Sequence, residues 1–535
     1  MQRIRKAYQA YYRAARGTVL GFFVMTILQK TLSVLMPDNT RALIDSAVYG
    51  GEAGAFGTIA VRELLLTAGF MVFLCIRYYL QNKIEIDATA FQRERVLLQV
   101  SKLDDTQMRS KPIGYYLQLV NGDIDTSKGL VATDLCIFIT NIFFAIAMIG
   151  YMLSVDAGLT LIFFVVIPLF AIITKIMIPK LEAANKRLIE ASETINNTVD
   201  DVIGGAQTIK LANAYAFMAK RINAFFAHYT DLKMKYMRLD LLYDFVLVTG
   251  LLNFGNILIY CIGGYMVIRG RVTIGTITIF AVYFSNLWNC AESFMAFFKE
   301  YKMKLISIDR INDFFAMKLE QEAPAEAALP PFEELRLQNV SFSYEHAEAA
   351  TLQHCHLQIQ RGDKLLIIGD NGSGKSTLAR LLVKLLRADA GEITYNGVSY
   401  EEIPPSEIRG KICLLTAEPF VFAGDLQTNL FGANGQLSLL KDVGIYDDIQ
   451  KGGGNLSSGQ KKTLQMSRGL ASPCDVYVFD EPLSFIDAHT KQEMIAFIET
   501  EFADKTVIVI SHDPAVWRFC DKVYRIENGG IVRER

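Results

Sequence analysis

Long apolar segments alternate with charged connections over the first 300 residues of the chain. Six of these segments are each about long enough to cross a hydrocarbon core of roughly 30 Å at 1.5 Å per residue. A single segment could be a helix buried in a soluble core, but six in succession predict transmembrane helices. The six segments run approximately over residues 18–36, 59–80, 129–153, 157–178, 244–268 and 274–298.

The pattern changes between residues 316 and 331, where three prolines stand among Ala and Glu residues. Beyond this stretch, short β-rich runs alternate with helical ones, which is typical of an α/β domain. The sequence therefore predicts an all-α membrane domain over 1–315, a linker over 316–331 and an α/β domain over 332–535.

Lys and Arg are distributed unevenly among the connections between the apolar segments. The N-terminus and the second and fourth connections together hold 21 of them, whereas the first, third and fifth hold 3. Positive charge favours the cytoplasmic side, so both termini and the two long connections are predicted to be cytoplasmic. The long connections read as helical extensions of the spans that reach toward the α/β domain.

The first 16 residues are basic, and their apolar positions recur at helical spacing. A cleaved transit peptide is one interpretation, but Ser is absent and a full span follows. We expect an amphipathic helix lying on the inner membrane surface. We also expect no processing of a leader peptide, because this stretch is too short for a peptidase domain.

Composition excludes several classes of protein. Hydrophobic residues make up 51% of the chain and the formal net charge is -2, so no global basic field indicates a nucleic-acid partner. The 8 cysteines are scattered without a CxxC pair, which favours free thiols over a zinc site or a disulfide framework.

One segment of the α/β domain fits the phosphate-loop pattern G-x-x-x-x-G-K-[ST], with a predicted strand before it (364–368) and a predicted helix after it (377–386). Its glycines let backbone N–H groups surround phosphates at a helix N-terminus. Lys375 would reach the β- and γ-phosphates, and Ser376 would bind Mg²⁺. The predicted ATP-binding residues of the loop are Gly369, Asp370, Asn371, Gly372, Ser373, Gly374, Lys375, Ser376 and Thr377.

A second apolar run, residues 476–479, ends in two acids about a hundred residues beyond the phosphate loop. It is typical of a buried strand in a parallel sheet. Asp480 would hold Mg²⁺, and Glu481 would act as the general base for water.

With these two motifs in place, the chain resembles a half-transporter of the ATP-binding cassette (ABC) superfamily, of the exporter type. Leu456 and the signature residues Ser457, Ser458, Gly459 and Gln460 resemble the family signature LSGGQ, with Ser458 in place of a glycine. Asp487 occupies the D-loop, His512 the switch histidine and Tyr344 the aromatic that stacks on adenine. In the membrane half, Gly114 and Asp123 resemble the first intracellular loop of such exporters, and residues 273–275 resemble the turn into the sixth span.

The resemblance implies an α/β P-loop NTPase domain of ABC type, with ATP and Mg²⁺ as cofactors. In this family the signature of one domain closes over the ATP held by another, so a second half-transporter is the expected partner. A homodimer is slightly favoured over a heterodimer. The other expected partners are membrane lipids and a transported substrate that the sequence does not identify. The location implied is the cell membrane, most simply the bacterial plasma membrane.

Two features depart from the family pattern. Ala417 stands where most members carry a glutamine that helps bind Mg²⁺, and only 38 residues separate it from Leu456, which predicts a trimmed helical subdomain. Glu481 and His512 are retained, so a slow but genuine ATPase that exports or flips a substrate is expected. A nucleotide-gated membrane protein and an importer with the exporter fold are the alternatives.

Overall fold

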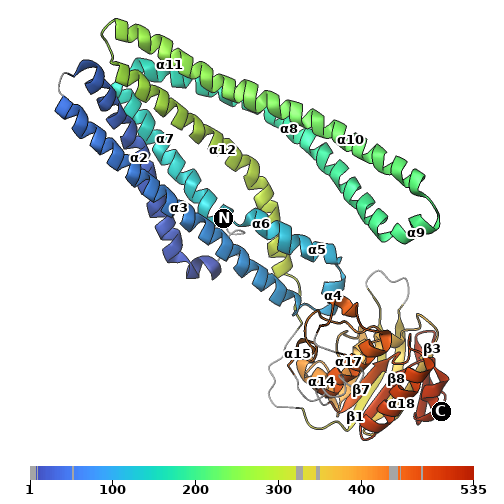
Figure 1. Cartoon of the computed structure of the whole chain (residues 1–535). Coiled ribbons are helices and arrows are strands. Elements are labelled where there is room, and N and C mark those ends of the chain that lie inside the picture. Colours follow the sequence, from blue (N-terminus) through green and yellow to red (C-terminus); the bar gives the residue numbers. More distant parts are fainter. Residues whose placement is uncertain are drawn as a thin grey trace. The chain divides into compact units, whose positions relative to one another are not determined.

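The computed structural model describes residues 8, 10–50, 53–320, 329–344, 350–432, 444–445, 448–471 and 474–535. The chain forms two compact units. The helical unit comprises Met1–Val96 and Gly114–Phe315, and the C-terminal unit comprises Leu97–Ile113 and Ala316–Arg535. The predicted fold class, a helical membrane domain followed by an α/β domain, is confirmed (Figure 1).

Long helices make up most of the helical unit. Four of the predicted apolar segments each lie within one helix, whereas 129–153 covers η2 and most of α7, and 244–268 covers most of η3 and all of α11. Within the described residues, five of these helical stretches are long and apolar enough to cross a membrane, and α12 is a further long helix with more polar residues. The helical elements are α2 (Arg16–Tyr49), α3 (Ala53–Val100), α5 (Ile113–Gln118), η1 (Leu119–Asp123), α6 (Ile124–Ser127), η2 (Leu130–Asp134), α7 (Leu135–Val155), α8 (Ala157–Gly204), α9 (Ala206–Leu211), α10 (Tyr215–Leu241), η3 (Leu242–Thr249), α11 (Gly250–Ile268) and α12 (Ile274–Phe315).

The outward faces of these helices carry large apolar side chains. Leu64 is 70% exposed and Phe245 is 69% exposed, a pattern that suits contact with lipid rather than water. The interior is packed around α12, where Phe284 and Trp288 are fully buried. The extensions α8 and α10 run side by side and are joined through α9 (Figure 1).

Polar contacts fix the start of α12 against α2. Thr273 donates its hydroxyl to Asp45 Oδ2 (2.7 Å), and the backbone N–H of Gly275 donates to Asp45 Oδ1 (2.9 Å). A Cβ on Gly275 would lie only 2.6 Å from the carbonyl oxygen of Arg41. Two helix backbones therefore approach so closely here that only glycine fits.

We expect Gly275→Ala to lower the melting temperature of the purified protein by several degrees, because overpacking costs about 1–3 kcal/mol. Gly264→Ala is the matched control, since a Cβ at that helical position would meet nothing within 4 Å. Thermal unfolding in detergent measures both variants. Equal melting temperatures would contradict the close approach.

The expectation for the N-terminal stretch needs correction where the structure describes it. Tyr8 and Tyr11 are buried in the helical unit rather than turned toward the membrane surface. The Tyr8 hydroxyl lies 2.7 Å from Ser127 Oγ, and the Tyr11 hydroxyl donates to the carbonyl of Ile84 (3.0 Å). Aromatic residues with a polar tip suit either environment, and hydrogen-bond partners on the protein decide it here. Residues 1–7 and 9 lie outside the described residues.

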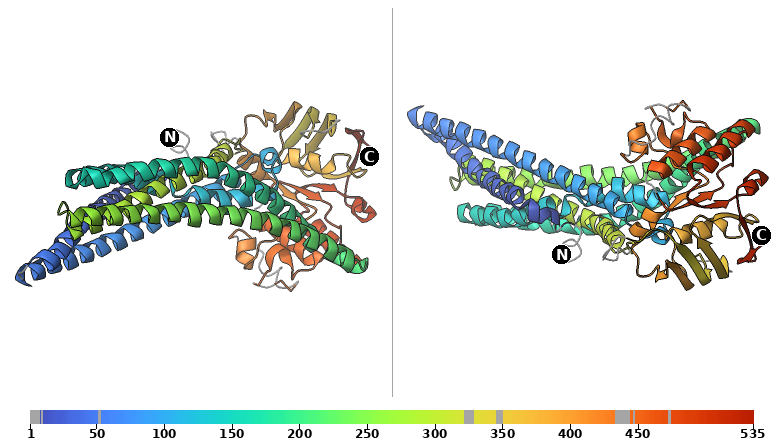
Figure 2. Two further views of the ribbon diagram at one scale, coloured as in Figure 1. Left: turned by 90° about the horizontal axis from the view of Figure 1, so that it is seen from above. Right: turned by 90° about the horizontal axis from the view of Figure 1, so that it is seen from below.

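Two sheets form the framework of the C-terminal unit (Figure 2). One has the order β2-β1-β4-β5 and is antiparallel; the other has the order β10-β9-β3-β8-β7-β6 and is parallel except for β10. The strands are β1 (Glu334–Phe342), β2 (Leu352–Gln360), β3 (Lys364–Gly369), β4 (Ala390–Tyr395), β5 (Val398–Ser399), β6 (Ile412–Leu415), β7 (Val476–Asp480), β8 (Thr506–Ile510), β9 (Lys522–Glu527) and β10 (Gly530–Arg533).

Within the described part of this unit, the helical elements are short. They are α4 (Asp105–Arg109), α13 (Lys375–Leu382), α14 (Pro405–Lys411), α15 (Leu426–Asn429), η4 (Lys451–Gly453), α17 (Ser458–Ala471), α18 (Ala488–Glu501) and η5 (Pro514–Arg518). The predicted helix over 377–386 begins two residues earlier and ends four residues earlier than expected. Lys384 adopts a left-handed φ of 53°, a conformation that ends helices and leaves no local sequence signal when the residue is not glycine.

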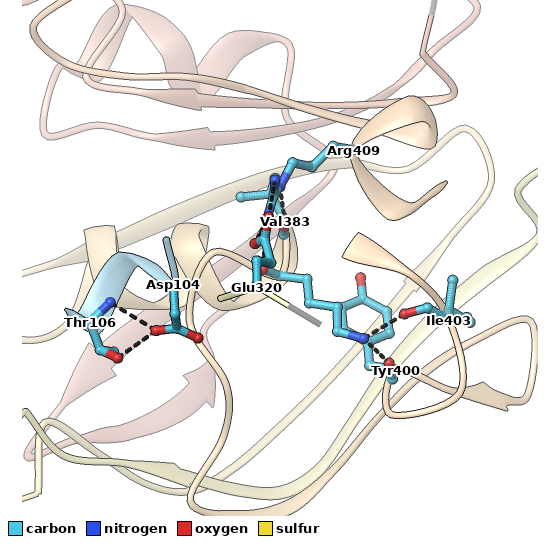
Figure 3. Close-up of polar contacts among 8 residues, drawn as sticks. Asp104, Thr106, Glu320, Val383, Tyr400, Ile403 and Arg409 are labelled. Carbon is cyan, nitrogen blue, oxygen red and sulfur yellow. Dashed lines mark hydrogen bonds and ion pairs between the residues drawn. The ribbon is translucent and has the colours of Figure 1, made fainter. Parts of the chain in front are cut away.

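The segment Leu97–Ile113 belongs to the C-terminal unit, although the sequence analysis counted it with the membrane domain. Leu103 pairs with Leu319 as an antiparallel bridge, and the N–H of Glu320 donates to the carbonyl of Lys102 (2.9 Å). The Glu320 carboxylate in turn forms a two-pronged ion pair with Arg409 at the end of α14 (Figure 3). This arrangement ties a stretch between two membrane helices to the α/β fold.

Candidate active site

The carboxyl ends of three adjacent parallel strands place the predicted motifs at one edge of the sheet. In β8, Ile510 is the register partner of both Ile367 in β3 and Asp480 in β7. The residues that follow these strands are the phosphate loop, Glu481 and His512. Ligands bind at this edge in open α/β sheets, so the topology brings together what the sequence predicted separately.

The phosphate loop connects β3 to α13. Gly372 and Gly374 have φ angles of 82° and 104°, which side chains rarely adopt. A Cβ on Gly374 would also lie 2.8 Å from Leu352 Cδ2 and 3.0 Å from the carbonyl oxygen of Thr351. The loop can therefore keep this tight turn only with glycine at that position.

Lys375 is 8% exposed and curls back over the loop. Its ammonium donates to the carbonyl oxygens of Gly369 (2.7 Å) and Asp370 (2.9 Å). Burial lowers the pKa of Lys375, while the carboxylates of Glu481 and Asp480 oppose that effect. A buried cation with two weak carbonyl partners is well suited to receive an anion.

The remaining loop residues complete a polar cradle at the N-terminus of α13. Ser373 Oγ is buried without a hydrogen-bond partner among the described residues, so it can contact a ligand. Asp370, Asn371 and Ser376 are exposed at the mouth of the loop. The donor set and the glycine turn fit a polyphosphate.

Tyr344 and Thr377 lie on the flank of α13. The Tyr344 hydroxyl is 3.2 Å from Thr377 Oγ1 and accepts from Arg380 Nη1 (3.1 Å). The ring of Tyr344 packs edge-on against Phe342. These contacts fix its hydroxyl beside the phosphate loop, and base stacking by the ring stays a prediction.

Asp480 and Glu481 differ in their surroundings. Asp480 is 8% exposed at the end of β7. Glu481 has a left-handed φ of 50°, and its N–H donates to the carbonyl of Ile510 (2.8 Å). Burial raises the pKa of the Glu481 carboxyl, and His512, whose Nε2 lies 4.0 Å from Glu481 Oε1, is the largest opposing influence. A strained backbone and a raised pKa are typical of a proton-accepting site.

The signature residues begin α17. Ser457 and Gln460 form a reciprocal cap: the Ser457 N–H donates to Gln460 Oε1 (2.9 Å) and the Gln460 N–H donates to Ser457 Oγ (3.2 Å). Ser458 donates its hydroxyl to the carbonyl of Phe485 (2.5 Å), which joins the signature to the turn before α18. A Cβ on Gly459 would lie 3.0 Å from Thr490 Cγ2.

Asp487 caps α18. Its Oδ1 accepts from the N–H groups of His489 and Thr490, each at 3.0 Å, and its Oδ2 accepts from the Thr490 hydroxyl (2.7 Å). The Thr490 hydroxyl and these N–H donors lower the pKa of Asp487 to about 2. Asp487, the predicted D-loop residue, is thus held by contacts within its own domain.

Lys462 is a site residue that the sequence analysis missed. It lies one turn before Met466 on the buried face of α17, and its ammonium donates to the carbonyls of Ala417 (2.5 Å) and Glu481 (2.8 Å). A charged residue on the apolar face of a helix was the available signal. Of the described residues between Ala417 and Leu456, only α15 and the turn η4 are helical. Residues 433–443 and 446–447 lie outside the described residues, so the trimmed subdomain stays a prediction.

The helical unit holds a separate cavity of about 200 Å³ between the start of α7 and α12. Phe138 and Phe297, which stack at 4.4 Å, form part of its wall. Lys304 and Asp134 form an ion pair (2.8 Å) at its charged side. Asn141 is 3% exposed, and its Oδ1 has no hydrogen-bond partner among the described residues.

Two family descriptions match the chain. The one described as ABC transporter transmembrane region matches residues 18–289, and the one described as ABC transporter matches residues 352–484. Together they span the apolar helices of the helical unit and the strands from β2 to β7.

Similar proteins share most of the chain's length. A lactococcin transport/processing ATP-binding protein of Lactococcus lactis is 24% identical over 97% of this chain and 74% of its own length. A putative multidrug export ATP-binding/permease protein of Bacillus subtilis is 21% identical over 99% and 95%. An ATP-dependent lipid A-core flippase of Desulfotalea psychrophila is 23% identical over 83% and 80%.

A solved structure shares the fold. A bacterial Atm1-family ABC exporter with ATP bound superposes with a TM-score of 0.78 at 18% identity, covering 97% of this chain and 94% of that one. At 18% identity, the similarity shows that the two proteins share a fold.

Proposed function

Because the chain belongs to the ABC transporter family, with a membrane region and an ATP-binding region in one polypeptide, we propose that it exports or flips a substrate as half of an ATP-driven dimer. The observation that carries this proposal is the meeting of Lys375, Asp480, Glu481 and His512 at one edge of the sheet. A merely nucleotide-gated protein has no need of a half-buried carboxylate with a left-handed backbone beside a histidine.

The proposed roles follow from the geometry. Lys375, the loop glycines and Ser373 hold the phosphates of ATP. Ser376 and Asp480 hold Mg²⁺, which would neutralise charge on the phosphates when bound. Glu481 accepts the proton of the attacking water, and His512 orients the Glu481 carboxylate.

Signature residues Ser457, Ser458, Gly459 and Gln460 are proposed to contact ATP held by a second half-transporter. One chain carries one phosphate loop and one signature, so both composite sites require two chains. Retention of Glu481 and His512 supports a homodimer over a pair with one spoiled site. Affinity purification of a tagged copy from cells that also express an untagged copy should recover both; recovery of a different half-transporter at equal stoichiometry would contradict the homodimer.

The uneven Lys and Arg distribution supports cytoplasmic termini and a bacterial plasma-membrane location. Gly54 belongs to the first connection, and a side chain there would meet nothing within 4 Å. A Gly54→Cys variant should react with a membrane-impermeant maleimide in intact cells. A Gly410→Cys variant, equally unobstructed but in the C-terminal unit, should react only after lysis.

The cavity between α7 and α12 supports a direct substrate contact. Its aromatic wall and the unpartnered Asn141 oxygen suit an amphipathic molecule that offers a hydrogen-bond donor. Glu292, a carboxylate of α12, is already engaged within the helix, since it accepts from Trp288 Nε1 (2.7 Å).

Transport is tested by ATP turnover of the protein in nanodiscs against lipids, peptides and amphiphilic drugs. We expect a slow basal rate that rises severalfold with a compound that inverted vesicles then accumulate. Asn141→Leu should remove the stimulation and keep the basal rate. Turnover that no compound alters would favour the gating alternative, and loss of compound from inverted vesicles would indicate import.

A further inference from the structure

A buried lysine joins the signature helix to the backbone of the hydrolytic glutamate. Lys462 is 4% exposed, and its Nζ donates to the carbonyl of Ala417 at 2.5 Å and to the carbonyl of Glu481 at 2.8 Å. Burial lowers the pKa of Lys462, and the carboxylates of Asp480, Glu481 and Glu418 oppose this. An ammonium is rarely buried without a specific task, because desolvation of a charge is costly.

The Glu481 carbonyl is one of two anchors of an unusual backbone conformation. The left-handed φ of Glu481 is unfavourable for a residue with a Cβ and persists only where its surroundings hold it. The N–H side is held by the carbonyl of Ile510 (2.8 Å). The carbonyl side is held by Lys462 and by the hydroxyl of Ser484 (2.9 Å). Lys462 therefore helps to set the direction of the Glu481 side chain.

The other acceptor of Lys462 is the carbonyl of Ala417, the residue that stands where most family members carry a glutamine that helps bind Mg²⁺. Ala417 has no polar side chain, so it can form hydrogen bonds with the active-site residues only through its backbone. Lys462 links the two residues, because its Nζ donates both to the Ala417 carbonyl (2.5 Å) and to the Glu481 carbonyl (2.8 Å). Gln465 on the same helix adds a bond from its Nε2 to Thr416 Oγ1 (3.1 Å).

We propose that Lys462 is a positioning residue for ATP hydrolysis: its ammonium orients Glu481 and couples it to residues 416–419. The inference rests on the proposed role of Glu481 as base. The chain also offers lysines that make the same two-carbonyl contact away from this site, which allows a positioning role to be separated from a purely stabilising one.

Lys364 and Lys384 are these matched controls. Lys364 starts β3, at the strand end remote from the phosphate loop, and donates to the carbonyls of Phe502 (2.6 Å) and Lys505 (2.5 Å). Lys384 donates to the carbonyls of Tyr400 and Ile403, the latter at 2.5 Å.

The experiment compares Lys462→Met with Lys364→Met and Lys384→Met in the full-length protein in nanodiscs. Lys462→Met should lower kcat by about 10- to 100-fold, as expected when a base is misplaced by about 1 Å. Its affinity for a fluorescent ATP analogue and its KM should stay within about threefold, because the phosphate loop is untouched. Hydrogen exchange of the backbone amides of residues 416–418, 481, 483 and 484 should accelerate in the same variant. The control variants should lose similar thermal stability with kcat nearly unchanged.

Lys462→Arg keeps the charge and the donors, and it should recover part of kcat; it also serves if the methionine variant does not fold. An equal fall of kcat in all three methionine variants would show that Lys462 only stabilises the fold and does not position Glu481. A rise in KM with kcat unchanged would overturn the proposal, as would Lys462→Arg behaving like Lys462→Met. If Glu481→Gln stays active, the proposed base is wrong; if Glu481→Gln is inactive while Lys462→Met is normal, only the positioning role fails.

Discussion

Lys375→Ala is expected to abolish measurable ATP turnover, a fall of at least about 100-fold, and to weaken nucleotide binding. The buried ammonium now bonded to the Gly369 and Asp370 carbonyls is the one cation placed inside the loop itself. Its loss leaves the phosphate charge without the cation that the loop places beside it. Turnover by phosphate release and binding of a fluorescent ATP analogue measure the two effects.

Lys364→Ala is the control for Lys375→Ala, because it removes another partly buried ammonium from β3 at the remote end of the strand. It should lower thermal stability while turnover and nucleotide affinity stay near those of the unmodified protein. If Lys375→Ala keeps both its ATP affinity and its rate, the phosphate-loop assignment is wrong.

Glu481→Gln should lower turnover by about 10²- to 10⁴-fold, the range for loss of a general base, and leave ATP binding intact. The amide keeps the shape of the side chain but cannot accept a proton from water. ATP should therefore raise the melting temperature of this variant at least as much as that of the unmodified protein, since bound nucleotide is not consumed.

Glu493→Gln is the matched control for Glu481→Gln. Glu493 is an exposed carboxylate of α18 whose recorded partner is His489 (3.5 Å). Its replacement removes the same charge from the same domain and should leave turnover unchanged. A Glu481→Gln variant that hydrolyses ATP at the normal rate would show that another group activates the water.

Local pattern was enough to predict the chain's architecture and the two main motifs. Apolar length indicated the helices of the membrane region. The strand–glycine loop–helix pattern predicted the connection from β3 to α13, the helix that Lys375 begins. The parallel register that brings Glu481 and His512 beside this loop follows from two buried apolar runs that each end in polar residues.

Contacts made by backbone atoms escaped sequence analysis. Lys462 acts on carbonyl groups, which every residue possesses, so neither Ala417 nor Glu481 reveals the bond by its identity. The same holds for Ser458: its hydroxyl replaces a glycine hydrogen and finds the carbonyl of Phe485, a contact set by the fold of the turn before α18. The early end of α13 was not predicted either, because the residue with a left-handed φ that follows it is Lys384 and not a glycine.

The division of the chain also depends on long-range contacts. A bridge between Leu103 and Leu319 joins residues more than two hundred positions apart, and no periodicity within either segment predicts such pairing. The aromatic stripe of the N-terminus illustrates the same limit, because its amphipathic pattern fits a membrane surface and a protein surface equally.

The C-terminal unit is built from two separate parts of the sequence, so it cannot fold until both have been synthesised. Leu97–Ile113 is translated roughly two hundred residues before Ala316, a delay of roughly ten to forty seconds at ordinary elongation rates. During that interval the bridging edge at Leu103 has no native partner and is open to chaperones or to wrong pairing. Nascent chains stalled before residue 316 should therefore be cut readily by protease within 97–113, and chains released at full length should resist.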